Sequence, residues 1–373
     1  MRRAGVVAGG LVVLVFVFVL PVVLDPFRLN LLGKYLCFAL VALGLDLLWG
    51  YAGQLSLGQS VFFGLGAYLF GMYLKLESSG GKLPDFMSWS GLTQLPAFWQ
   101  PFSSPVVALV GAILIPGVLG TALGYLLSRS GIVGVYFAIV TQALAFIATT
   151  LFIGQQPFTG GTNGLTNFST IFGLPLRDAE VQVRMFQVTA MVLAVCLAFT
   201  LWLARSRFGR LLVALRDDEQ RVRFSGYNPT LLRALVFGLS AALAGLGGAL
   251  FVPQVGIVNP DSLGIILGIQ MVIWVAVGGR GTLIGAVVGA IVVNAAQTAV
   301  SESLPDLWQY GIGALFVATV LLFPQGLVGG SLSLWERLNQ GVRGASLPGR
   351  HPHPRSAPPL PEGEAVPSKE VAV

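Results

Sequence analysis

Residues 50–67 read GYAGQLSLGQSVFFGLGA, and their first part, residues 50–56, separates two long apolar runs, residues 29–49 and residues 57–76. Each run is long enough to cross a bilayer, because a spanning helix needs about 20 apolar residues. Gly50 and Gly53 loosen the helix between the runs, and irregular backbone is tolerated at membrane depth only against protein or a water-filled cavity. The stretch therefore predicts a membrane protein with broken helices.

The composition of the whole chain supports this class. Of its 373 residues, 55% are hydrophobic and 10% are charged, and the mean hydropathy is +0.80, whereas soluble domains carry about 25% charged residues. We predict an all-α polytopic transmembrane bundle of about ten spans within a transmembrane domain at residues 1–337. The predicted spans are 5–24, 29–49, 57–76, 105–127, 132–153, 185–204, 231–252, 262–279, 281–300 and 308–326.

The basic residues predict the orientation. With a cytoplasmic N-terminus, the inside segments hold most of the arginines, including the group in residues 205–229, as the positive-inside rule requires. The long connections 77–104 and 154–184 then lie outside, and both termini are cytoplasmic. Residues 338–373 are rich in proline, glycine and charge, which predicts a disordered cytoplasmic tail. The outside segments keep six basic residues, Arg28, Lys34, Lys75, Lys82, Arg177 and Arg184.

The sequence offers no sign of catalysis. Cys37 and Cys196 lie inside apolar runs, where cysteines act as small hydrophobes, and His351 and His353 lie among prolines without a third ligand. The chain has no phosphate-binding loop and no hydrolase motif. We therefore expect that the chain is not an enzyme and has no metal or cofactor, and that any ATP is hydrolysed by a partner.

Uncharged polar side chains inside the apolar runs are candidates for lining a route across the membrane. An amide or hydroxyl in hydrocarbon needs a partner, and a passing solute can be one. For the glycines of residues 50–67, helix packing is an equal alternative. For Thr141 and Gln142, the alternative is an interhelical hydrogen bond. Asp46 is either a functional group or the partner of a nearby donor. The predicted pathway residues are Asp46, Gln54, Ser56, Gln59, Thr141, Gln142 and Gln270.

Residues 204–229, ARSRFGRLLVALRDDEQRVRFSGYNP, form a mixed-charge segment on the predicted cytoplasmic side. Leucines recur on one stripe at helical spacing, and Gly226 is a plausible helix stop. The acids among the arginines favour docking into a protein groove over lying on a membrane, with a solvated loop as the alternative. The predicted docking residues are Arg210, Leu212, Leu215, Asp217, Asp218, Glu219, Arg221 and Gly226.

The chain outside its tail resembles the permease subunits of branched-chain amino acid type ABC importers, and among them it looks most like the urea-transport subunit. The resemblance is carried by LGLDLLWGYAGQLSLGQSVFFGLGAY at 43–68, KLPDF at 82–86, GVYFAIVTQAL at 134–144, GGTNGLTNF at 160–168, GRLLVALRDDEQRVRFSGYN at 209–228 and MVIWVAVGGRGTLIGAVVGA at 271–290. It implies a multi-pass protein of a bacterial-type cytoplasmic (inner) membrane. The implied partners are a second homologous permease, two cytoplasmic ATPase subunits and an extracytoplasmic substrate-binding protein.

The chain departs from the pattern of this family in three places. The urea-type pattern has a histidine at the position of Gln59 and an acid at the position of Gln270. The coupling pattern of the importers, Glu-Ala-Ala with a later glycine, is matched only by Glu219 and Gly226. These differences put an imidazole-based or carboxylate-based substrate contact in question.

Three classes of function follow from these patterns. The first is an alternating-access permease for urea or a short-chain amide, favoured because the middle of the membrane is nearly free of charge apart from Asp46. Its alternative is a branched-chain amino acid permease, whose zwitterionic substrate needs compensation for two charges. A stand-alone channel or secondary carrier is the second class. A membrane enzyme is the third, and Asp46 alone is too little for it.

Overall fold

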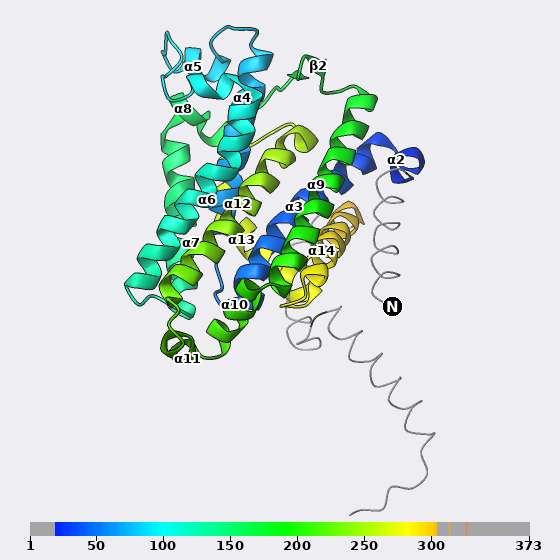
Figure 1. The fold of residues 1–373 in the computed structure, drawn as a ribbon. Helices are drawn as coiled ribbons and strands as arrows, with labels where there is room; N and C mark the ends of the chain where they lie inside the picture. The colour runs from blue at the N-terminus through cyan, green and yellow to red at the C-terminus, as the bar shows by residue number, and fades with distance from the viewer. Residues whose placement is uncertain (1–18, 304–312, 314–325, 327–373) are drawn as a thin grey trace, which may run out of the picture. The chain divides into compact units, whose positions relative to one another are not determined.

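The computed structural model describes residues 19–303, 313 and 326, which belong to one compact unit within residues 1–331. The described residues are mostly helical, and β1 (Thr170–Ile171) and β2 (Leu174–Pro175) pair as a small antiparallel hairpin (Figure 1). The predicted span 5–24 lies almost wholly outside the described residues. The predicted span 308–326 and the tail 338–373 also fall outside them, apart from single residues.

The all-α membrane fold is confirmed. Six described helices are long and apolar enough to cross a membrane, and eight of the predicted spans fall on helices. The long helices are α3 (Pro26–Asp46), α4 (Gln59–Ser78), α6 (Pro105–Arg129), α7 (Val135–Gly154), α9 (Ala179–Arg205), α12 (Pro229–Val255) and α14 (Leu283–Ser303), and α13 (Ile265–Gly278) is shorter.

The predicted full span at 262–279 is the one that the structure corrects. A 3-10 turn, η4 (Pro260–Leu263), occupies its start, and α13 begins after the extended Gly264 and has 14 residues. A helix of this length falls short of the roughly 20 residues that cross a bilayer. The apolar composition of 262–279 reflects burial among other helices, since most of the second half of α13 is buried.

α12 packs against α4, α6 and α3 at the centre of the helices. Glycines let the backbones touch: a Cβ at Gly66 of α4 would meet the Gly245 backbone of α12, and a Cβ at Gly245 would meet the carbonyl oxygen of Ala112 in α6. A Cβ at Gly248 would meet the carbonyl oxygen of Phe63. These contacts support the packing alternative for the glycine of α4.

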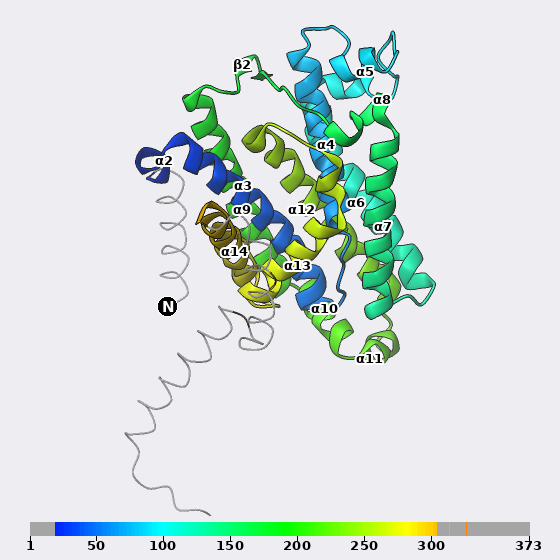
Figure 2. The same ribbon diagram turned by 180° about the vertical axis from the view of Figure 1, so that it is seen from behind.

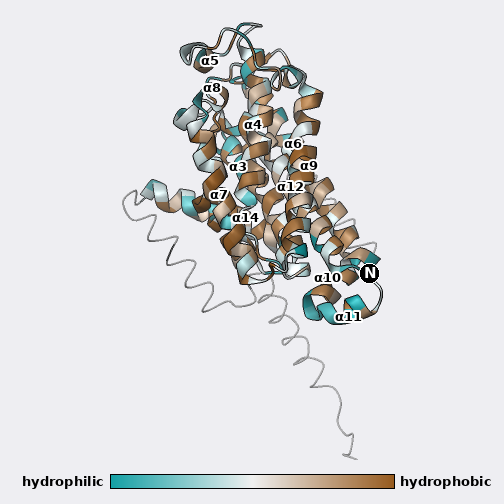
Figure 3. Ribbon diagram, turned by 90° about the vertical axis from the view of Figure 1, so that its left-hand side faces the viewer, coloured by the Kyte–Doolittle hydropathy of each residue, from teal (hydrophilic) through white to brown (hydrophobic). Residues whose placement is uncertain are grey.

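The burial of the helices separates an inner group from an outer one. In the apolar window of α3, 83% of residues are buried, against 28% in both α7 and α9. Figure 3 shows hydrophobic residues along the long helices and hydrophilic ones gathered on α10 (Arg207–Asp217) and α11 (Glu219–Phe224). The outward apolar surfaces of α7 and α9 are therefore suited to lipid.

The short elements gather at the two ends of the long helices. α2 (Leu20–Val23) precedes α3, while α5 (Asp85–Trp89), η2 (Gln100–Ser103), α8 (Gln156–Thr159), η3 (Gly161–Asn163) and the β hairpin lie in the two long connections. In Figure 1, α5, α8 and β2 lie at one end of the bundle, and α10 and α11 lie at the other.

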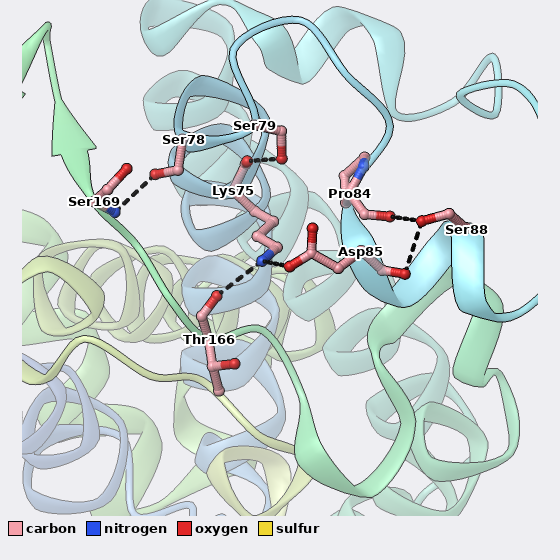
Figure 4. Close-up of polar contacts among 8 residues, drawn as sticks. All are labelled: Lys75, Ser78, Ser79, Pro84, Asp85, Ser88, Thr166 and Ser169. Carbon is pink, nitrogen blue, oxygen red and sulfur yellow. Dashed lines mark hydrogen bonds and ion pairs between the residues drawn. The ribbon is translucent and has the colours of Figure 1, made fainter.

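The last turns of α4 hold the two long connections together (Figure 4). The buried Lys75 donates from Nζ to Oδ2 of Asp85 and to the carbonyl oxygen of Thr166, both at 3.2 Å. Ser78 Oγ accepts from the backbone N–H of Ser169 at 2.9 Å. Lys75 thus joins the KLPDF segment to the GGTNGLTNF segment at a single cation.

Candidate functional site

The helix break predicted at residues 50–67 is the centre of the candidate site. α3 passes into one π-helical turn, η1 (Leu47–Tyr51), and the chain then runs without regular structure until α4 begins at Gln59. Gly53 has a φ of 75°, a conformation that glycine adopts without strain. The expected loosening at Gly50 and Gly53 is therefore confirmed.

Polar side chains of three helices meet at this break. Thr141 Oγ1 of α7 accepts from the backbone N–H of Leu57 at 3.1 Å, and Gln59 Nε2 donates to Ser240 Oγ of α12 at 2.8 Å. Ser56 Oγ accepts from the N–H of Gly58 at 3.3 Å. Thr141 thus satisfies a backbone group that the break leaves free, which is the hydrogen-bond alternative for this residue.

Gln54 differs from these residues. Its side chain is 3% exposed, yet neither its Oε1 nor its Nε2 has a hydrogen-bond partner among the described residues. Oε1 of Gln59 is also without a partner there. A buried unpaired amide is costly, so these amide groups have capacity left for a polar solute, as does the unpaired Oδ2 of Asp46.

The other predicted pathway residues lie apart from the break or on its margin. Gln142 is half-buried within α7, and its side chain forms no hydrogen bond with the described residues. Gln270 is half-buried in α13 and lines a separate cavity. The structure therefore brings Gln54, Ser56, Gln59 and Thr141 together and does not group Gln142 or Gln270 with them.

Asp46 holds the end of α3 against the turn between α13 and α14. Its Oδ1 accepts from the backbone N–H of Gly281 at 2.6 Å, and its side chain is fully buried. Beside it, Arg280 donates from Nε and Nη2 to the carbonyl oxygen of Trp49 at 3.2 and 3.0 Å. The guanidinium also lies 5.0 Å from the centre of the Trp49 ring, a cation–π distance. Asp46 is thus the partner of a nearby donor.

The charge of Arg280 is influenced by its surroundings. Burial lowers the pKa of its guanidinium first, the nearby positive charge of Arg216 lowers it further, and the carboxylate of Asp46 raises it. An arginine pKa lies far above neutral at the outset. The group therefore stays charged, and two cations share this end of α3.

Arg216 connects the helix break to α10. Its Nη1 donates to the carbonyl oxygen of Gly50 at 2.7 Å, and its Nε pairs with Asp217 Oδ1 at 3.0 Å. A Cβ at Gly53 would meet the side chain of Arg216. The predicted docking segment and the predicted helix break, 166 residues apart in sequence, are therefore in direct contact.

The apolar stripe of the segment is already used inside the chain. Leu212 and Leu215 are 0% and 3% exposed, so they seat α10 on its own protein and leave no free surface for a partner groove. The exposed face of α10 and α11 carries charged side chains, including Arg210, Asp217 and Arg221. Beyond them, the ring of Phe224 is 91% exposed.

The acids of the segment have structural partners. Asp218 Oδ1 caps α11 by accepting from the N–H of Arg221 at 3.1 Å, as N-terminal aspartates do. Glu219 Oε2 accepts from Nη2 of Arg233 in α12 at 2.7 Å. Gly226 has a φ of 84° just after α11, so the predicted helix stop is confirmed.

A separate cavity of ≈ 740 Å³ lies in the half of the bundle away from α10. Its walls come from the first part of α3, the segment 259–267 and the last turns of α14, with contributions from α4, α7 and α12. Figure 2 shows α3, α13 and α14 together on the side from which these walls come. The volume falls within the range of roughly 300–1,000 Å³ that small-molecule sites occupy.

Charged residues line this cavity near the ends of the helices. Lys34 lies inside α3, one of the candidate spans, and lines the cavity together with Asp261 and Glu302. Sequence reasoning placed Lys34 outside although the predicted span 29–49 contains it. The presence of a lysine within a predicted span was the sequence signal that could have identified Lys34 as a cavity residue.

The chain matches the family described as "Branched-chain amino acid transport system / permease component" over residues 27–320. It is 27% identical over 316 residues to the high-affinity branched-chain amino acid transport system permease protein LivM of Salmonella typhimurium, which covers 78% of this chain and 67% of that protein. It is 23% identical over 300 residues to the high-affinity branched-chain amino acid transport system permease protein BraD of Pseudomonas aeruginosa, covering 78% of this chain and 91% of BraD. No solved structure matches the chain.

Proposed function

This chain belongs to the family of permease components of branched-chain amino acid transport systems, and we propose that it is a membrane-spanning subunit of an ATP-driven importer for aliphatic amino acids. The names of LivM and BraD support this substrate class over urea. The charged cavity supports it as well, since a zwitterion needs groups of both signs. In this proposal a second permease, two ATPases and an extracytoplasmic binding protein complete the transporter.

The bond from Arg216 to Gly50 carries the proposal of ATP-driven transport. α10 extends from the end of α9 and contacts the point where the spanning segment breaks. A force applied to α10 would therefore reach the break through one hydrogen bond and the packing of Gly53. A stand-alone channel or carrier does not require a connection between a cytoplasmic helix and the helix break.

The exposed face of α10 and α11 is the proposed contact with the ATPase, on the cytoplasmic side. Phe224 is the exposed aromatic residue on it that fits the profile of an interface anchor, because aromatic side chains dominate binding energy at interfaces. Charged neighbours such as Arg210 and Arg221 would set orientation more than strength. The connections 77–104 and 154–184 then face outside, together with Lys75, which joins them, and both termini are cytoplasmic.

Urea or a short amide is the second candidate substrate. The unpaired amide of Gln54 at the break favours it, since a neutral solute with several hydrogen-bond groups could satisfy that side chain. Uptake of labelled leucine and labelled urea by cells with the whole transporter, and by cells lacking this chain, decides between them. Loss of leucine uptake alone is the expected result, and loss of urea uptake alone would reverse the choice.

The docking proposal has its own test. Phe224→Ala should reduce co-purification of the ATPase with the chain. Trp89→Ala should not reduce it, because Trp89 is similarly exposed, at 84%, but lies in the connection 77–104, which faces outside in this proposal. If both variants co-purified with as much ATPase as the wild type does, Phe224 would not be part of the interface.

A further inference from the structure

The cavity at the first part of α3 contains a cation without an ionic partner. Lys34 lines it, and no carboxylate of the described residues lies within ion-pair distance of its Nζ. Its ammonium group lies 5.7 Å from the centre of the Phe38 ring, which also lines the cavity. A lysine inside a spanning helix is costly and faces a partner or a cavity. The ammonium group of Lys34 therefore has hydrogen-bonding and charge capacity left for an anion in the cavity.

The same cavity has carboxylates that also lack a cation. Asp261 follows η4's first residue, and Glu302 lies in the last turn of α14. Neither forms an ion pair with the described residues, although Asp261 Oδ2 accepts a hydrogen bond from Asn259 Nδ2 at 2.9 Å. The cavity thus presents groups of both signs that form no ion pair within the described part of the chain, and both carboxylates are exposed.

Aromatic rings form the remaining wall. Phe38 of α3, Phe63 of α4 and Phe251 of α12 line the cavity and contact one another with ring centres 5.2 to 5.8 Å apart. The three rings are 5%, 0% and 9% exposed, so they back the cavity, and the apolar surface beside them comes from Phe146 and Ile266, which also line the cavity and are 62% and 76% exposed. A ligand that fits all three walls carries an anionic group, a cationic group and an apolar side chain.

We propose that this cavity binds a free aliphatic amino acid, with Lys34 facing its α-carboxylate, Asp261 and Glu302 attracting its α-ammonium, and the apolar side chains of Phe146 and Ile266 contacting its side chain. The choice among zwitterions rests on the proposed function. The assignment of Lys34 rests on the cavity alone. Lys34 is thus the specificity-determining residue for the carboxylate.

Direct binding to the purified full-length chain in lipid nanodiscs tests the proposal without the other subunits. Ligand-observed NMR, carried to millimolar concentrations, would compare leucine with leucinamide, which lacks the carboxylate, and with 4-methylpentanoate, which lacks the ammonium. A hydrogen bond between charged groups predicts that leucinamide binds about 10- to 100-fold more weakly than leucine. Alanine should bind more weakly than leucine, by about fourfold per methylene removed.

Substitution of Lys34 gives the second readout. Lys34→Gln should weaken leucine binding by about the same 10- to 100-fold and remove the preference over leucinamide, while Lys34→Arg should retain most of the preference and show that the fold survives. Lys82→Gln is the matched control, since Lys82 is an exposed lysine outside the cavity. Equal binding of leucine and leucinamide by the wild type, no binding, or unchanged binding by Lys34→Gln would overturn the proposal.

The two proposals fail separately. Leucine uptake by the whole transporter without leucine binding to the chain would leave the function standing and overturn the cavity as its site. Binding of leucine that depends on Lys34, in a transporter that does not take up leucine, would support the cavity and overturn the proposed function.

Discussion

Arg216→Gln should uncouple ATP hydrolysis from transport. The substitution removes the guanidinium that donates to the carbonyl oxygen of Gly50 at 2.7 Å. A hydrogen bond from a charged donor contributes about 1.5–3 kcal/mol. The side chain of Arg216 is 36% exposed, so water competes for the donor, and about 1–2 kcal/mol is the expected loss.

That loss sets the size of the effect. If the bond carries the movement of α10 to the helix break, about 1–2 kcal/mol corresponds to a fall of about 5- to 30-fold in leucine uptake per ATP hydrolysed. The assay is the reconstituted transporter in liposomes, with uptake and ATP hydrolysis measured in the same vesicles. The ATPase should remain bound to the variant, because Arg216 contacts the break.

Arg129→Gln is the matched control. Arg129 is an exposed arginine in the last turn of α6, outside α10 and α11, so it belongs neither to the break nor to the proposed ATPase contact. Substitutions at such surface positions change free energies by about 0.5 kcal/mol or less. If uptake per ATP were the same in Arg216→Gln, Arg129→Gln and the wild type, the bond would have no part in coupling.

Three further outcomes are expected. Gly66→Ala should lower the free energy of unfolding by about 1–2 kcal/mol, because overpacking against the α12 backbone outweighs the gain in helix propensity. Gly154→Ala should not lower it, because a Cβ at Gly154 meets nothing within 4 Å. Thermal unfolding in detergent would measure both effects. Lys75→Met should speed proteolysis of residues 160–175, since the carbonyl oxygen of Thr166 loses its donor at a cost of about 1–2 kcal/mol, and the same rate for Lys75→Met and the wild type would refute this. A cysteine at the exposed Gln220 should react with an impermeant reagent only from the cytoplasmic side, and labelling of intact cells would reverse the predicted orientation.

The long helices and the break could be predicted because their signals are local. Run length locates the spans, and Gly50, Gly53 and Gly226 mark the places where the chain leaves helical geometry. The short helix after Gly264 could not be predicted in the same way. Its residues are as apolar as a span, and only their burial by neighbouring helices distinguishes the two cases.

The contacts of the site were harder to predict than its residues. Gln54, Gln59 and Thr141 attract attention as polar groups in apolar runs, but nothing in the sequence tells that Thr141 lies beside Leu57. Leu212 and Leu215 have the spacing of a docking stripe, and that spacing does not say whether the groove belongs to a partner or to the same chain. α3 is buried on most of its surface, so its pattern does not reveal that Lys34 borders a cavity.

The backbone contacts among α4, α12 and α6 limit which substitutions this sequence can accept. At Gly66, Gly245 and Gly248 any side chain would collide with main-chain atoms of the next helix, which no change of rotamer can relieve. The outward faces of α7 and α9 impose only apolarity, so many residues can replace one another there. A library of functional variants would consequently show invariant glycines deep in the protein, and their invariance would report helix contact and not a place where solute binds.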